Sequence, residues 1–146
     1  MKNLIQKRSF LNLLMVFVLI AAMALTMTAC GKPEAQVVDG TIVSDGGDIG
    51  KGSKSFAFEV VDIEGESTKF TVKTDKETVG EALQEVQLIA GEIGPYGLYV
   101  KTVNGDTHVY EDGGHYWAFY VNGEYGMTGV DLTPIDETAV YMFKAE

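Results

Sequence analysis

The sequence predicts an α+β fold in which a mixed, mostly antiparallel sheet packs against one helix. Residues 56–60 and 70–72 alternate between apolar and other side chains, as strands do, and a short polar turn separates them. A helix-capping motif follows, and the rest of the chain has Asn-Gly and Asp-Gly turns between apolar runs. The expected order of elements, β-β-α-β-β-β, is that of an α+β roll.

The helix is predicted from its first residues and from its apolar face. Thr78 and Glu81 have the spacing of a capping box, in which each side chain bonds the backbone N–H of the other residue. One face collects the apolar residues Val79, Ala82, Leu83, Val86 and Ala90. Gly91 is expected to end the helix in a left-handed conformation.

Three further strands are expected after the helix, at residues 98–103, 115–121 and 138–144. Asn104-Gly105 closes the first of them, and Asn122-Gly123 follows the second. A turn centred on Asp112-Gly113 would place Tyr110 opposite His115 in a hairpin, and His108 opposite Trp117.

Residues 1–29 have the layout of a secretory signal peptide. Lys2, Lys7 and Arg8 precede the apolar run Phe10–Met27, which small residues follow. The tetrapeptide 27–30, Met-Thr-Ala-Cys, resembles a bacterial lipobox, in which the cysteine is acylated and becomes the new N-terminus. Because Cys30 is the only cysteine, acylation also avoids an unpaired thiol in an exported chain. The alternative is an uncleaved transmembrane anchor with an incidental thiol.

The remaining chain is predicted to divide into a flexible linker, residues 30–54, and one folded domain, residues 55–146. The linker is rich in glycine and shows no sustained apolar period, so it cannot offset its own chain entropy. Residues 30–146 carry 8 lysines against 21 acidic residues, a net charge of −13. This charge repels phosphate backbones and excludes nucleic acid as a partner.

Several segments resemble the transcobalamin C-terminal-like domain family, which in bacteria is a domain of unknown function in secreted and cell-wall proteins. The resemblance rests on residues 94–100, Gly-Pro-Tyr-Gly-Leu-Tyr-Val, on residues 116–123, Tyr-Trp-Ala-Phe-Tyr-Val-Asn-Gly, and on Gly129-Val130-Asp131. It implies a ubiquitin-like β-grasp fold over residues 55–146. In the animal carriers of this family cobalamin lies between this domain and a helical domain, so a corrinoid site here would need half of its pocket from a partner.

An aromatic set is the first candidate binding surface. All seven tyrosines lie within residues 96–141, and the candidate ligand-binding residues are Tyr96, Tyr99, Tyr116, Trp117 and Tyr120. Tyrosine combines an apolar ring with a polar tip, which suits a flat or sugar-like ligand or a protein. The alternative is that the aromatic side chains fill the core. Trp117 is expected to be structural, near the helix face, and Tyr99 or Tyr120 to be the better recognition residue.

A histidine segment is the second candidate site. Both histidines lie between residues 106 and 115, and the candidate metal ligands are Asp106, His108, Glu111, Asp112 and His115. As diagonal neighbours in the predicted hairpin, the two histidines would have Cβ atoms ~7 Å apart, so their imidazoles could converge on one divalent ion. The alternative is a solvated polar turn.

The function expected from these observations is non-catalytic. The sequence has no Gly-x-Ser-x-Gly elbow, P-loop or His-Glu-x-x-His motif. We therefore expect a ligand- or partner-binding module, lipid-anchored on the outer face of a bacterial cell membrane, that uses its tyrosine and tryptophan surface. The alternative is a lipoprotein that binds a divalent metal through His108 and His115.

Overall fold

The computed structural model of the 146-residue chain describes residues 36–38 and 40–146, which belong to one compact unit. The predicted signal segment 1–29 and Cys30 lie outside the described residues. Through the helix, the elements are β1 Gln36–Val38, β2 Thr41–Val43, β3 Gly47–Gly50, β4 Lys54–Val61, β5 Ser67–Thr74 and α2 Val79–Glu85. After it come β6 Ile89–Gly94, β7 Gly97–Val103, β8 Asp106–Thr107, α3 Tyr110–Gly113, β9 Trp117–Val121, β10 Glu124–Tyr125, the 3-10 helix η1 Val130–Leu132 and β11 Val140–Ala145.

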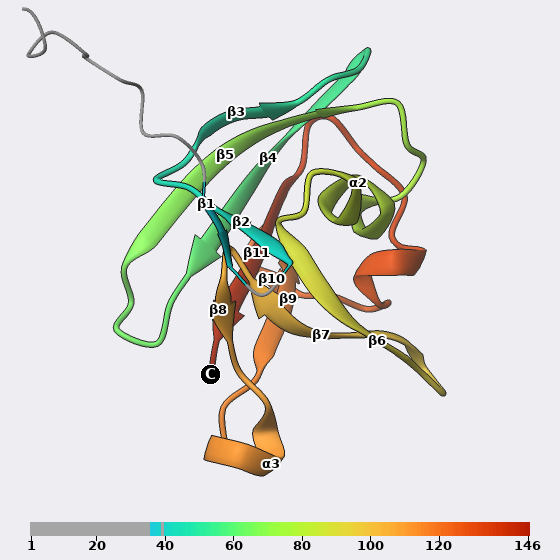
Figure 1. Cartoon of the computed structure of the whole chain (residues 1–146). Helices are drawn as coiled ribbons and strands as arrows, with labels where there is room; N and C mark the ends of the chain where they lie inside the picture. Colours follow the sequence, from blue (N-terminus) through green and yellow to red (C-terminus); the bar gives the residue numbers. More distant parts are fainter. Residues whose placement is uncertain (1–35, 39) are drawn as a thin grey trace, which may run out of the picture. The chain divides into compact units, whose positions relative to one another are not determined.

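The main sheet has six strands in the order β10-β9-β11-β4-β5-β3 (Figure 1). The last strand, β11, pairs in parallel with β4, and β3 pairs in parallel with β5, while the other pairs are antiparallel. Helix α2 and the three-stranded sheet β6-β7-β8 pack on one side of it (Figure 1). The predicted α+β fold with a mixed, mostly antiparallel sheet is therefore confirmed.

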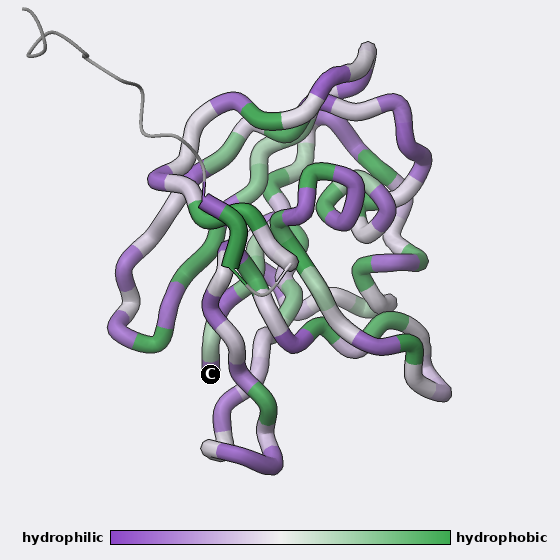
Figure 2. Tube along the Cα trace, in the orientation of Figure 1, coloured by the Kyte–Doolittle hydropathy of each residue, from purple (hydrophilic) through white to green (hydrophobic). Residues whose placement is uncertain are grey.

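The predicted hairpin of residues 56–60 and 70–72 is strands β4 and β5. Phe58 lies opposite Phe70, and both side chains are buried, whereas their neighbours Ala57 and Thr71 point to the other face. Figure 2 shows the resulting alternation of hydrophobic and hydrophilic residues along these strands. The period of two therefore sets which face of the sheet meets the core.

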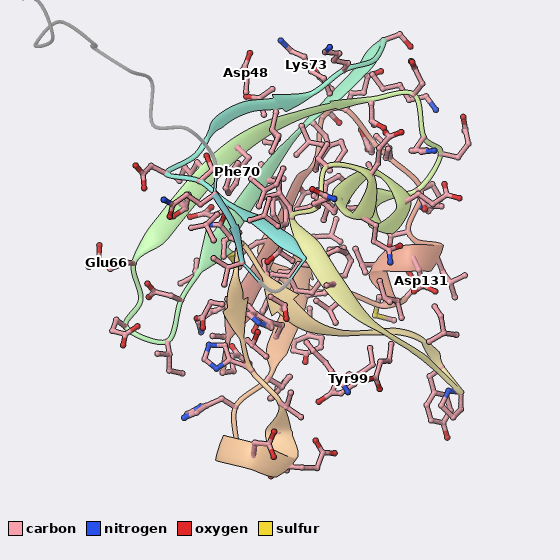
Figure 3. The ribbon with its side chains drawn as sticks, in the orientation of Figure 1. Asp48, Glu66, Phe70, Lys73, Tyr99 and Asp131 are labelled. Carbon is pink, nitrogen blue, oxygen red and sulfur yellow. The ribbon has the colours of Figure 1, made fainter. Side chains whose placement is uncertain are left out.

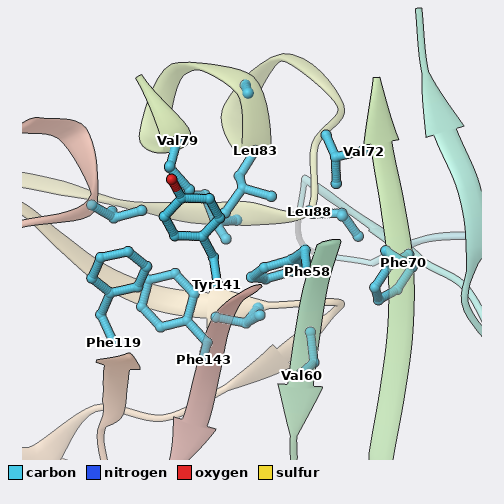
Figure 4. Packing of buried hydrophobic residues seen from close by; sticks show 14 of the residues in the cluster. Phe58, Val60, Phe70, Val72, Val79, Leu83, Leu88, Phe119, Tyr141 and Phe143 are labelled. Carbon is cyan, nitrogen blue, oxygen red and sulfur yellow. The ribbon is translucent and has the colours of Figure 1, made fainter. Parts of the chain in front are cut away.

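The core fills the space between the main sheet and α2 (Figure 4). Tyr141 of β11 is buried below the helix, and its ring stacks on Phe119 of β9 at 6.3 Å between centroids. Its hydroxyl group donates to the Pro134 carbonyl at 3.1 Å and accepts from the Asp136 N–H at 2.7 Å. The tyrosine therefore buries its ring without leaving its hydroxyl group unpaired.

Helix α2 begins as the sequence predicts. The Thr78 hydroxyl accepts a hydrogen bond from the Glu81 N–H at 3.3 Å, and the Glu81 carboxylate accepts one from the Thr78 N–H at 3.4 Å. These two bonds satisfy donors that the first helical turn leaves without an intrahelical partner.

The helix ends six residues earlier than the predicted stop at Gly91. It stops at Glu85, Gln87 adopts a left-handed φ of 56°, and the Leu88 N–H donates to the Leu83 carbonyl at 2.9 Å. The sequence pattern misleads here because the apolar residues after Glu85 fit a helical face, whereas Leu88 and Ile89 enter the core from the turn after the helix and from the start of strand β6.

The predicted hairpin of residues 106–121 is wrong. The Asn104-Gly105 turn, with φ values of 48° and 83°, folds β8 back onto β7, so Asp106 lies opposite Val103. Residues 110–113 form α3 instead of continuing a strand. The turn at Asn104-Gly105 is favoured over the predicted turn at Asp112-Gly113 because pairing β8 with β7 closes a shorter loop.

The predicted flexible linker 30–54 also needs correction from residue 41 onward. Strand β3 joins the main sheet, with Ile49 opposite Val72, and Thr41 is fully buried. Gly46 and Gly50 have positive φ values, and a Cβ at either position would overlap a backbone carbonyl of β5. The glycines therefore permit close approach to β5, which composition alone cannot distinguish from flexibility.

Candidate functional site

The predicted aromatic ligand residues do not form one surface. Tyr96 is 95% exposed at the tip of the β6–β7 hairpin. Tyr99 is exposed on β7, where the Lys101 ammonium lies 5.8 Å from its ring centroid (Figure 3). Tyr116 and Tyr120 are partly buried at and within β9. The set thus splits between the hairpin and the main sheet.

Trp117 is a core residue and is unavailable to a ligand at the surface. Its side chain is 6% exposed, its indole N–H donates to the Asp106 carbonyl at 3.2 Å, and its ring meets the His108 ring at 5.1 Å. The structural role predicted for Trp117 agrees with this burial. These contacts are with the segment that follows β7, while Trp117 shares one buried cluster with Val79, Leu83 and Val86 of the predicted helix face, so its place near that face stays a prediction.

Within the histidine segment, His108 contacts both Asp106 and His115, two of the other four predicted metal ligands. The His108 Nε2 atom lies 2.9 Å from the Asp106 Oδ2 atom, and the His108 and His115 rings are 6.1 Å apart in an edge-to-face arrangement. Glu111 and Asp112 are exposed on α3. Within residues 36–38 and 40–146, no three His, Cys, Asp or Glu side chains are placed so that they could hold a metal ion.

A carboxylate that the sequence did not single out as a site residue is the least satisfied polar group of the fold. The Oδ1 atom of Asp131, in η1, is buried and has no hydrogen-bond partner among the described residues. A Cβ on Gly97 would lie 2.9 Å from both Asp131 carboxylate oxygens, and one on Gly129 would lie 2.6 Å from Oδ1. Figure 3 shows Asp131 beside the β6–β7 hairpin. A buried charged oxygen without a partner costs at least about 1–3 kcal/mol.

Exposed apolar side chains occupy the two segments that meet at Asp131. Ile93 and Tyr96 belong to the β6–β7 hairpin, whereas Met127, 98% exposed, and Leu132 belong to the segment around η1. The two segments approach each other at Gly129, where a Cβ would lie 3.9 Å from the Tyr96 carbonyl oxygen. Exposed apolar groups around an unsatisfied polar atom are typical of a ligand site.

A second polar cluster joins strands β9, β10 and β11. The Tyr120 hydroxyl donates to Glu146 Oε1 at 2.8 Å, and this bond lowers the pKa of Glu146 and raises that of Tyr120. The Tyr125 hydroxyl donates to the Tyr116 hydroxyl at 3.4 Å, and that bond, with burial, raises the pKa of Tyr125 to about 12. Tyr125 and Glu146 were not among the predicted site residues.

Sequence signals for the missed residues exist but are weak. Asp131 follows Gly129 in a segment that resembled a known family, yet nothing local shows that Gly97 packs on its carboxylate. Glu146 becomes part of a cluster only because its backbone pairs with that of Tyr116. Both relationships join residues far apart in sequence.

No helix in the described ranges has both the length and the hydropathy needed to cross a membrane.

The comparisons with known proteins support the fold and leave the activity open. A candidate metal-binding protein from Ruminococcus gnavus ATCC 29149 has a similar crystal structure, with 26% identity, a TM-score of 0.60, and coverage of 64% of this chain and 97% of that chain. Haptocorrin, solved in complex with Cbi, matches with 15% identity and a TM-score of 0.49 over 64% of this chain. The chain spans only 25% of haptocorrin.

No curated protein matches the chain. Residues 76–142 match the model of DUF4430, a domain of unknown function. The match runs from just before α2 to the middle of β11, and this part of the chain is similar to that family.

Proposed function

We propose that this protein is a non-catalytic binding module that takes its ligand at Asp131, between the β6–β7 hairpin and η1. The chain is held on the outer face of a bacterial cell membrane by acylated Cys30, as its first 30 residues suggest. Its partners are an extracellular ligand or protein rather than nucleic acid, because the net charge of the full chain is −10.

The observation that carries this proposal is the unpartnered Oδ1 atom of Asp131. The groups packed against the carboxylate include the backbone of Gly97 and Gly129, which offers no compensating charge. Because Oδ1 is buried, a ligand with an ammonium or N–H group would pair with the Asp131 carboxylate only as the β6–β7 hairpin moves away from it, and an apolar body would then cover Ile93, Tyr96 and Leu132.

A thermal-shift panel with the full chain in detergent tests this function. The panel contains phenethylamine, cyanocobalamin, N-acetylglucosamine oligomers and divalent metal salts, since any ligand that binds only the folded state raises the melting temperature. We expect a shift with a compound that carries an N–H or ammonium donor, and loss of that shift in Asp131→Asn. Asp136→Asn, at an exposed carboxylate, is the matched control. A shift that survives Asp131→Asn would contradict the proposed site.

A second candidate function, divalent-metal binding, is favoured by the pair of histidines. The His108 Nε2 atom already faces a carboxylate oxygen, and the His115 ring lies 6.1 Å from the His108 ring, so a side-chain rotation could direct both imidazoles to one ion. The similar protein from Ruminococcus gnavus is itself a candidate metal-binding protein. Imidazole and carboxylate ligands suit zinc, nickel or copper better than calcium.

Calorimetry with zinc chloride tests the metal site. His115→Ala is the informative variant, because His108 also packs on Trp117 and its removal would disturb the core. We expect the full chain to release or absorb heat on zinc addition, and His115→Ala to lose this heat. Equal heats from both proteins, or no heat from either, would reject the metal site.

Anchoring through Cys30 has its own test. We expect Cys30→Ala to prevent acylation and to change the mass, processing or membrane retention of the expressed protein. A full-length chain with unaltered mass that stays in the membrane fraction would instead support a transmembrane anchor.

A further inference from the structure

A tyrosine face lies on the outer side of the main sheet, away from the core, and consists of Tyr110, Tyr116, Tyr120, Tyr125 and Glu146. Tyr116 and Glu146 exchange two backbone hydrogen bonds, of 2.9 and 3.0 Å, so their side chains project from the same face of the sheet. Tyr120 lies opposite Tyr125 in the pairing of β9 with β10. Helix α3 adds Tyr110, whose ring is 6.4 Å from that of Tyr116.

The hydroxyl groups of this face form a connected chain that ends on one carboxylate. Glu146 accepts hydrogen bonds from Tyr120 at 2.8 Å, from Tyr116 at 3.5 Å and from the Lys144 ammonium at 3.0 Å. Tyr125 donates to Tyr116 at 3.4 Å. The carboxylate is therefore held in position by neighbours before any ligand arrives, which reduces the ordering cost of binding.

Two of the four tyrosine rings of this face are exposed, and Tyr116 and Tyr120 are partly buried. Tyr110 is 60% exposed and Tyr125 is 54% exposed. Tyr120 and Tyr125 meet edge to face at 5.1 Å, and so do Tyr110 and Tyr116 at 6.4 Å. In an edge-to-face pair, the ring that contributes its edge leaves its own flat side uncovered, so each pair offers a platform for stacking.

We propose that the tyrosine face binds a neutral carbohydrate. The apolar C–H side of a sugar ring stacks on an exposed tyrosine, and its hydroxyl groups exchange hydrogen bonds with Glu146 and the tyrosine hydroxyls. Charge favours a neutral polymer: Lys144 and Glu146 pair at 3.0 Å, and the net charge of −10 repels anionic polymers. A cationic polymer would have to compete with Lys144 for Glu146.

This site is independent of the one proposed at Asp131, because the two share no residue. Tyr96, in the hairpin beside Asp131, therefore supplies a matched control for the tyrosine face. Tyr96→Ala removes a ring that is even more exposed than Tyr125, from the other site.

Affinity electrophoresis of the full chain, in a detergent without a sugar headgroup, tests the proposal. The gels contain starch, xylan, galactomannan or mixed-linkage β-glucan, with pectin as the anionic control and chitosan as the cationic control. We expect retardation by at least one neutral polymer and none by pectin or chitosan. For Tyr125→Ala and Glu146→Gln, the apparent affinity should fall at least about fivefold, and for Tyr96→Ala it should not change.

Three results would overturn this assignment. They are retardation by none of the four neutral polymers, equal retardation of wild type and Tyr125→Ala, and retardation only by a charged polymer or a protein partner. The melting temperature of each variant is measured beside the gels. If Tyr125→Ala lowers it strongly, Tyr110→Ala replaces it with the same expected loss of affinity, because Tyr110 is the other exposed ring of this face.

Discussion

The carboxylate of Asp131 packs on the backbone of Gly97, a residue more than 30 positions earlier in the chain. A Cβ added to Gly97 would lie 2.9 Å from both carboxylate oxygens, and its φ of 108° suits glycine. The close fit leaves Oδ1 buried and unpaired. A fold tends to tolerate such an atom where function requires it, and for this reason we place the ligand site there.

Trp117→Ala should lower the free energy of unfolding by about 3–5 kcal/mol, because it empties a buried aromatic site. Trp117→Phe should cost less, since it keeps a ring in the core and loses the hydrogen bond to the Asp106 carbonyl. Urea denaturation of both variants measures the two costs. If Trp117→Ala unfolded at the same urea concentration as wild type, the indole would not be a core residue.

Gly50→Ala should destabilise the fold more than Gly65→Ala. Both glycines have positive φ values, 81° and 88°, so both variants carry a similar backbone strain of about 1 kcal/mol. Only at position 50 would the new methyl group overlap the β5 backbone, because the space around Gly65 is open. Thermal denaturation of the two full-length variants compares them directly. Equal melting temperatures would mean that β3 contributes nothing to stability.

The stability of the protein should fall between about pH 10 and about pH 12 through Tyr125. Its pKa in the folded state is about 12, above the ordinary value of 10.0, because its hydroxyl group donates to Tyr116 and loses part of its contact with water. A group whose pKa is raised by folding stabilises the protein fully below its unfolded pKa and loses that contribution as the pH rises through the folded value. Tyr125→Phe cannot ionise, so its melting temperature should fall less steeply over this range. Identical pH profiles would exclude Tyr125 as the cause.

The sequence predicts the elements of this fold that depend on neighbouring residues, and it misses the features that depend on contacts between distant segments. The β4–β5 hairpin and the capping box at Thr78 follow from residues that are neighbours in the chain, so their patterns are visible. Helix α2 ends at Glu85 because Gln87 turns the chain and Leu88 and Ile89 then enter the core, an arrangement that periodicity cannot separate from a longer helix. The glycines near β3 resemble a linker in composition, although they contact β5.

The candidate sites were predictable to the same limited degree. Alternation in β9 correctly separated Trp117 from Tyr120, since successive side chains of a strand face opposite sides. The pairing of Tyr116 with Glu146, and the contact of Gly97 with Asp131, join segments about 30 residues apart. Such contacts form only when the distant strands and η1 pack together in the folded protein, and they define both proposed binding surfaces.

The free energy of unfolding of Asp131→Asn, measured by urea denaturation of the full chain without added ligand, tests the central claim most directly. Asparagine has nearly the same shape and no charge, so it replaces an unpaired charged oxygen with a neutral amide atom, which costs less to bury. We predict that Asp131→Asn is more stable than wild type by about 1 kcal/mol or more. If the variant is less stable than wild type, the carboxylate already has a stabilising partner in the fold, and Asp131 is a structural residue rather than a ligand site.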